Sequence, residues 1–104
     1  MEHLQFMFSD GRPATGPGTH ALVGVVASGN LEVMIERTEM SGRMQVDVHT
    51  AARGFGETWQ AVLDDFHARH PLGDVLVSIN DVGATPAVVS LRLDQAVEAL
   101  EEQS

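Results

Sequence analysis

Residues 21–36, ALVGVVASGNLEVMIE, contain two apolar runs on either side of a short polar turn, Ser28-Gly29-Asn30. The first run, ALVGVVA, is continuously apolar and β-branched, which is typical of a strand covered on both faces. The second run alternates, as a half-buried strand does, with Leu31, Val33 and Ile35 opposite Glu32, Met34 and Glu36. Gly29 and Asn30 both tolerate positive φ, so a hairpin is predicted across this turn.

Further alternating segments extend the predicted sheet in both directions along the chain. Residues 44–48 follow the turn residues Ser41-Gly42, which predicts a second hairpin, and residues 75–79 form one more strand. Near the amino-terminus Leu4, Phe6 and Phe8 share one face of a strand. Between that strand and residue 21 lies SDGRPATGPGTH, residues 9–20, with three glycines, two prolines and no apolar pattern. This composition predicts a flexible surface loop.

The apolar period changes from two to 3.6 residues after residue 54. One amphipathic helix is predicted to begin at Gly54 or Gly56, to end before Pro71, and to bury Trp59, Val62, Leu63 and Phe66. A second begins at Thr85 as the cap and Pro86 as the first helical residue. Its apolar face consists of Val89, Leu93, Ala96, Val97 and Leu100. Residues 87–93 could alternatively be a strand before a shorter helix.

Strands, helix, strand and helix in this order predict an α+β fold, a mostly antiparallel sheet with both helices on one face. The chain has 104 residues, of which 43% are hydrophobic. At this length a chain can bury one core, so residues 1–104 are predicted to be a single domain.

Charge and cysteine content exclude several classes of function. The formal net charge is −9, which argues against binding to nucleic acid or to an anionic membrane surface. No cysteine is present, so a disulfide scaffold, a thiolate nucleophile and a cysteine-ligated metal are excluded. The amino-terminus MEHLQFMF has no signal-peptide pattern and no stretch is long enough to span a bilayer, so a cytoplasmic protein is expected.

The sequence contains no pattern typical of an active site. Asp64 and Asp65 point in different directions on a helix, and the other aspartates, Asp47, Asp74, Asp81 and Asp94, are interpreted as solvated surface charge. His67 and His70 stand three residues apart on a helix, but zinc needs a third or fourth ligand, so no metal site is predicted. GRPATGPG lacks the Lys-Ser/Thr and the helix that follow a phosphate-binding loop, and GFGETW lacks the third glycine of a dinucleotide-binding fingerprint.

Ser28 is the remaining candidate for a special role. It stands where a strand ends and the Gly29-Asn30 turn begins, so its hydroxyl is expected to project into solvent from an accessible hairpin. Serine is also simply a common turn residue. No histidine is close in sequence to activate Ser28, so nucleophilic catalysis by it is not expected, and no catalytic residue is predicted.

The stretches VVASGNLEV and NDVGATP resemble the acyl carrier (delta) subunit of malonate decarboxylase, and the similarity continues through GFGETWQAVLDDFHARHPL to the carboxy-terminal helix. The resemblance implies a carrier that catalyses no step. Ser28 would hold 2′-(5″-phosphoribosyl)-3′-dephospho-CoA through a phosphodiester, with Gly29 providing the turn geometry. The implied partners are an acyltransferase subunit, decarboxylase subunits and the transferase that attaches the group. They would exchange acetyl for malonyl on its thiol and release carbon dioxide.

Three features of the residues agree with a carrier. A chain without cysteine must import the thiol of a thioester on a cofactor. A long arm keeps the acyl group at high effective concentration near several active sites. An acidic surface suits transient docking to basic partners.

Two alternatives remain open: an unmodified acidic interaction domain with an ordinary turn serine, and an acyl carrier of the citrate lyase type, which has a related Ser-Gly site. The helical-bundle fold of fatty-acid acyl carriers is not expected, because the chain lacks their Asp-Ser-Leu motif.

Overall fold

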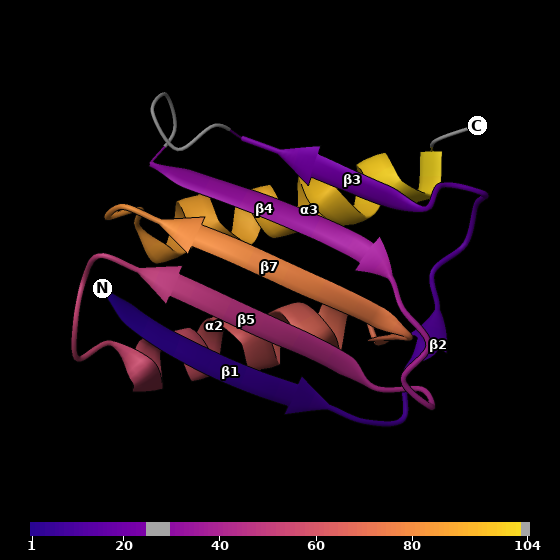
Figure 1. Ribbon diagram of the computed structural model, residues 1–104, viewed down its shortest axis with the longest axis horizontal. Coiled ribbons are helices and arrows are strands. Elements are labelled where there is room, and N and C mark those ends of the chain that lie inside the picture. Colours follow the sequence, from indigo (N-terminus) through magenta and orange to yellow (C-terminus); the bar gives the residue numbers. More distant parts are fainter. Residues whose placement is uncertain (25–29, 103–104) are drawn as a thin grey trace.

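The computed structural model describes residues 1–24 and 30–102, which form a five-stranded sheet and two helices (Figure 1). The strands are β1 (Glu2–Phe8), β3 (His20–Val23), β4 (Leu31–Arg37), β5 (Met44–Thr50) and β7 (Val75–Asp81). Two shorter strands, β2 (Arg12–Pro13) and β6 (Leu72–Gly73), pair with each other in parallel. The helices are α2 (Gly56–Arg69) and α3 (Pro86–Glu102). The predicted α+β class is confirmed.

The order of strands across the sheet is β1-β5-β7-β4-β3. The pairs β1–β5, β7–β4 and β4–β3 are antiparallel, and β5–β7 is parallel. The sheet is therefore mixed but mostly antiparallel, as predicted. The first predicted pairing is also present, because β3 and β4 are antiparallel neighbours with Val23 opposite Val33.

The second predicted hairpin is wrong. The turn exists, since Ser41 and Gly42 have φ values of 58° and 81°, but β4 and β5 do not pair with each other. Strand β7 lies between them and pairs with both (Figure 1). The buried side chains of β7, namely Val75, Val77 and Ile79, have no exposed surface. Such a strand is most stable in the centre of a sheet, where both of its edges find hydrogen-bond partners.

The prediction that residues 21–27 form a strand covered on both faces is also wrong for the part that is described. Strand β3 is the last strand of the sheet and ends at Val23. Ala21 faces the core and is 2% exposed, whereas the neighbouring Leu22 is 57% exposed. Both helices cover the opposite face, so the side of the sheet that carries Leu22 has no covering element among the described residues.

Both helices lie behind the same face of the sheet in Figure 1, with α3 against β3 and β4 and with α2 near β1. Between sheet and helices lies one cluster of buried side chains. The five residues predicted to form the buried face of α3 are all buried. On α2 the residues Trp59, Leu63 and Phe66 are buried, and Val62 is only partly covered.

The ends of both helices follow the expected signals. Helix α2 begins at Gly56, one of the two predicted positions, and ends at Arg69, before Pro71. Helix α3 begins at Pro86, and the Val88 N–H donates to the Thr85 Oγ1 at 3.3 Å as in a capping turn. Residues 87–93 are helical, which settles the alternative of a strand there.

The segment 9–20 has contacts that its composition did not predict. Strand β2 pairs with β6, and Ala14 is buried. The Arg37 guanidinium donates to the carbonyl oxygens of Ala14 and Gly18 and, at 2.7 Å each, to those of Thr15 and Gly16. One side chain thus gathers four carbonyl groups of the loop, whose flexibility stays a prediction.

In the part of the chain that the structure describes, neither helix combines the length and the apolar character that a bilayer crossing requires.

Candidate functional site

Ser28 and Gly29, the predicted attachment residue and its neighbour in the turn, lie outside the described residues, and their roles stay predictions. The structure describes the residues on both sides of them. Gly24 follows β3, and Asn30 precedes β4, which pairs with β3. Both have positive φ, 78° for Gly24 and 58° for Asn30.

Gly24 lies too close to neighbouring atoms to carry a side chain. A Cβ built on it would lie 2.4 Å from the carbonyl oxygen of Leu31 and 3.2 Å from the Arg92 Nε. Its positive φ would also strain any larger residue. Glycine here therefore allows β3, β4 and the Arg92 side chain to meet at the beginning of the segment that contains Ser28.

Asn30 is fixed from the other side by the loop after β7. The Val82 N–H donates to the Asn30 carbonyl oxygen at 2.9 Å, and Leu31 is opposite Asp81 in the sheet. Thr50, at the end of β5, is opposite Asp81 on the other side. The loops after β5 and β7 therefore lie at the same end of the sheet as the segment that contains Ser28.

Asp81 organises this end of the sheet, and its interpretation as solvated surface charge is wrong. It is 4% exposed. Its Oδ2 accepts a hydrogen bond from the Thr50 hydroxyl at 2.8 Å, and its Oδ1 accepts from the N–H groups of Gly83 at 3.2 Å and Ala84 at 2.8 Å. A buried carboxylate needs such partners. The NDVGATP motif thus supplies a carboxylate and the loop that folds around it.

An apolar pocket of about 270 Å³ opens at the same end of the sheet, between the first turns of α2 and α3. Phe55 borders it and is 52% exposed, although it is apolar. The pocket is lined by Ala52, Phe55, Thr58, Trp59, Val62, Asp81, Gly83, Ala84, Pro86 and Val89. Trp59, the only tryptophan of the chain, therefore reports on this pocket by its fluorescence.

Arg92 reaches this region from α3. Its side chain is partly buried, and its Nε is buried without a hydrogen-bond acceptor among residues 1–24 and 30–102. Leaving a buried N–H of a charged group without an acceptor is unfavourable, so this position suits a ligand that brings an anionic oxygen.

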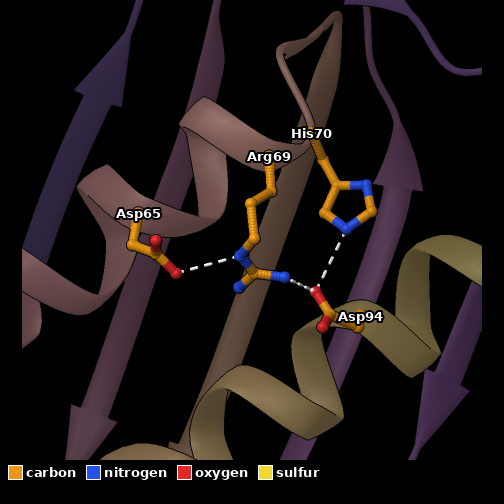
Figure 2. A network of polar contacts seen from close by, with 4 residues as sticks. All are labelled: Asp65, Arg69, His70 and Asp94. Atoms are coloured by element: carbon orange, nitrogen blue, oxygen red, sulfur yellow. Dashed lines mark hydrogen bonds and ion pairs between the residues drawn. The ribbon is translucent and has the colours of Figure 1, made fainter.

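A polar network joins the end of α2 to the middle of α3 (Figure 2). The Arg69 side chain lies between two carboxylates and donates to Asp94 and, at 2.9 Å, to Asp65. These hydrogen bonds, chiefly the one to Asp94, raise the pKa of the Arg69 guanidinium. His70 also contacts Asp94, with 3.1 Å between Nε2 and Oδ1. Pairs in such a partly exposed network contribute about 1 kcal/mol or less each. The contacts to Asp94 join α3 to the end of α2, whereas the pair between Asp65 and Arg69 lies within α2.

The two histidines considered for a metal have different surroundings. His67 stacks on Phe8, with 4.8 Å between ring centroids, and its Nε2 lies 3.2 Å from the Leu72 carbonyl oxygen. His70 is engaged with Asp94. Across residues 1–24 and 30–102 no three His, Cys, Asp or Glu side chains are grouped so as to hold a metal ion.

Asp74 and Asp94 are likewise structural rather than freely solvated. The Asp74 carboxylate accepts hydrogen bonds from the N–H groups of Met40 at 2.8 Å and Gly42 at 2.9 Å. These bonds lower the pKa of Asp74, and the bond from Gly42 has the larger effect. Asp47 lies on the surface of the sheet and accepts from the side chains of Gln5 and Gln45, each at 3.1 Å.

One of the two missed residues carried a signal in the sequence. Asp81 continues the period of two of β7 and falls on the same face as the buried Ile79, so its burial was predictable. Arg92 carried none, because an arginine beside the apolar face of a helix is ordinarily solvated.

Comparison with known proteins gives a consistent picture. Residues 18–100 match a family model described as malonate decarboxylase delta subunit. A malonate decarboxylase acyl carrier protein of Xanthomonas axonopodis pv. citri is 65% identical over 101 residues, which are 97% of this chain and 96% of that protein. The protein of the same description from Burkholderia cepacia is 62% identical over 96 residues, covering 92% and 87%.

A solved structure also matches along nearly its whole length. It is a chain in the crystal structure of a Pseudomonas malonate decarboxylase hetero-tetramer in complex with malonate. That chain is 40% identical to this one, with a TM-score of 0.82, and the match covers 96% of this chain and 99% of that one.

Proposed function

This chain belongs to the family of malonate decarboxylase delta subunits, the acyl carrier proteins of that enzyme, and on this basis we propose that Ser28 carries its acyl groups through a covalently attached arm. The observation that supports this most strongly is that the family match, residues 18–100, includes the Ser28-Gly29 turn. The frame around the turn agrees, because Gly24, Asn30 and Asp81 are fixed by contacts that hold the ends of this segment at one end of the sheet.

The proposed arm is 2′-(5″-phosphoribosyl)-3′-dephospho-CoA, attached to the Ser28 hydroxyl through a phosphodiester. When bound, it would supply the thiol on which acetyl and malonyl groups are held as thioesters, since the chain has no cysteine of its own. The described residues fit such a group in one respect: the buried Arg92 Nε beside Gly24 has no acceptor among them, and a phosphate brings one.

We propose further that the chain itself breaks no bond and presents its acyl groups to an acyltransferase and to decarboxylase subunits. The related Pseudomonas chain is part of a hetero-tetramer, and a third partner would be the transferase that attaches the arm. The expected cytoplasmic location stays a prediction.

The attachment is tested on protein made together with its own modification enzymes. Intact mass should show one added group, peptide mapping should place it on Ser28, and Ser28→Ala should abolish it without unfolding the domain. The matched control is Ser41→Ala, because Ser41 also precedes a glycine in an exposed turn and should accept no group. A group mapped to Ser41, Ser78 or any other residue would contradict the assignment.

Activity of the assembled enzyme separates a carrier from a simple interaction domain. The isolated chain should not turn over malonate, modified or not. With its partner subunits the acetylated form should support release of carbon dioxide, and the Ser28→Ala complex should not. If the modified, fully assembled complex gave no turnover, the interaction domain would become the better account. Turnover by the Ser28→Ala complex would show that the acyl group is held elsewhere.

A further inference from the structure

Arg92 lies at the beginning of the segment that contains Ser28. A methyl group built on Gly24 would be 3.2 Å from the Arg92 Nε and 3.3 Å from its Cδ, so the side chain of Arg92 runs along the Gly24 backbone. Ser28 and Asn30 are separated by one residue, Gly29, so covalent geometry keeps their Cα atoms within about 7 Å of each other. Gly24, which Arg92 contacts, precedes Ser28 by four residues, so a group on Ser28 is attached within about 14 Å of the Gly24 backbone.

The surroundings of Arg92 differ from those of the other arginines. All six basic residues of the chain are arginines. Arg37 donates to four loop carbonyls, Arg43 to the Met40 carbonyl at 2.9 Å, and Arg69 to two carboxylates. Arg12 and Arg53 are exposed to solvent. Arg92 is partly buried, and among residues 1–24 and 30–102 it makes no ion pair and its Nε finds no acceptor.

The chemistry of the guanidinium group decides which ligand suits this position. Arginine presents several N–H groups in a planar arrangement that matches the oxygens of a phosphate, and charge-assisted hydrogen bonds are stronger than neutral ones. The net charge of −9 repels anions from the molecule as a whole, so an anionic group held against it needs a local positive charge.

We propose that Arg92 binds a phosphate oxygen of the group carried by Ser28 and thereby holds the first part of the arm against the carrier. This inference rests on the proposed attachment at Ser28. The Nε–H donates to a nonbridging oxygen, which supplies the missing acceptor. The positive charge of the guanidinium neutralises one phosphate charge. The acyl end of the arm stays free to move, whereas its anchored end is oriented by α3.

The test compares the unmodified and modified forms of ¹⁵N-labelled protein by NMR of the arginine Nε–Hε groups. The signal of Arg92 is assigned as the one that disappears in unmodified Arg92→Lys. In the modified form we expect this signal to shift downfield, and its exchange with water to slow by roughly tenfold, as for one charge-assisted hydrogen bond. The control is the Arg43 signal, at the opposite end of the sheet, which should be the same in both forms.

Intact mass and peptide mapping precede the spectra, so the two ideas fail separately. If the group is on Ser28 and the Arg92 signal is the same in both forms, the Arg92 inference is wrong and the carrier role stands. If the group is absent from Ser28 in correctly modified material, the proposed function fails, and the inference with it.

A pair of variants distinguishes phosphate binding from a purely structural role. Arg92→Gln and Arg43→Gln change the net charge equally. Modification should raise the thermal unfolding midpoint of the wild type and of Arg43→Gln by a similar amount, and that of Arg92→Gln by less, because the coupling is lost. If Arg92→Gln lowers the midpoints of both forms equally, Arg92 only supports the fold and the inference is overturned.

Discussion

At the scale of the residue, a few residues at one end of the sheet fix the residues on either side of the segment that contains Ser28. Asp81 accepts three hydrogen bonds in a buried site, and through the loop that it folds, the Val82 N–H reaches the Asn30 carbonyl oxygen. Gly24 permits the close approach of Arg92. These contacts fix where the segment with Ser28 leaves the sheet and where it returns.

Gly29 provides the prediction at this scale. If the turn needs a positive φ at Gly29, Gly29→Val should slow attachment of the arm by at least an order of magnitude while Ser28 is still present, because a Cβ strains that conformation. The rate is measured by intact mass against time. Gly54→Val is the control: Gly54 also has a positive φ, 85°, and lies in the neighbouring loop, so it shares the strain but not the turn. Equal rates for wild type and Gly29→Val would mean that the turn geometry is not required.

At the scale of the element, the connection between β4 and β5 has to pass around the end of β7. Asp74, at the start of β7, accepts hydrogen bonds from the Met40 and Gly42 N–H groups, and its own N–H donates to the Arg43 carbonyl at 2.7 Å. It adopts a φ of 57°, which aspartate tolerates better than most residues. One residue thus ties β7 to the connection that encloses it.

The charge of Asp74 predicts a dependence of stability on pH. Its pKa is lowered in the folded state by the Gly42 and Met40 N–H groups, so its contribution is fully present above the unfolded pKa of about 3.9 and is lost as pH falls through the folded pKa. Asp74→Asn keeps a side-chain oxygen that can accept hydrogen bonds and a residue type that tolerates positive φ, but it removes the negative charge. We expect it to lower the urea midpoint at pH 7, and the difference from wild type to shrink below about pH 4. A difference that is constant from pH 7 to pH 3 would show that the charge is unimportant.

At the scale of the whole molecule, the sheet has one face covered by helices and one face without a covering helix among the described residues (Figure 1). The covered face contains the apolar stripe of α2, in which Trp59, Leu63 and Phe66 are between 0 and 6% exposed. Three of the four residues of the predicted stripe are thus core residues, whereas Val62 is only partly covered and lines the pocket together with Trp59. The rest of the surface belongs to a molecule whose net charge is −9.

That charge predicts how association responds to salt. Association rates with the partner subunits should fall as ionic strength rises, because the screening length decreases from about 10 Å at 0.1 M to about 3 Å at 1 M. Stopped-flow measurements across this range test it, with Trp59 fluorescence as one signal. An association rate that is independent of salt would instead indicate an apolar, permanent interface.

Local patterns in the sequence were sufficient to predict the elements and most of their buried faces. An apolar period of 3.6 residues predicted the two helices, and Thr85-Pro86 and Pro71 predicted where one begins and the other ends. An apolar period of two predicted the buried side of β4, β5 and β7. These patterns are local, because burial of one face repeats with the geometry of the element. Membership of the carrier family followed from the residues around Ser28 and from NDVGATP.

The contacts between distant segments, in contrast, became known from the three-dimensional fold. Strand β7 lies between β4 and β5, although a short connection favours pairing of neighbours, because the choice of partner depends on the total burial and hydrogen bonding of the sheet. Asp81 meets Thr50 across 31 residues of sequence, and Arg92 meets Gly24 across the helix–sheet interface. Such long-range contacts leave no periodic signal in the chain, since each depends on the relative placement of two complete elements.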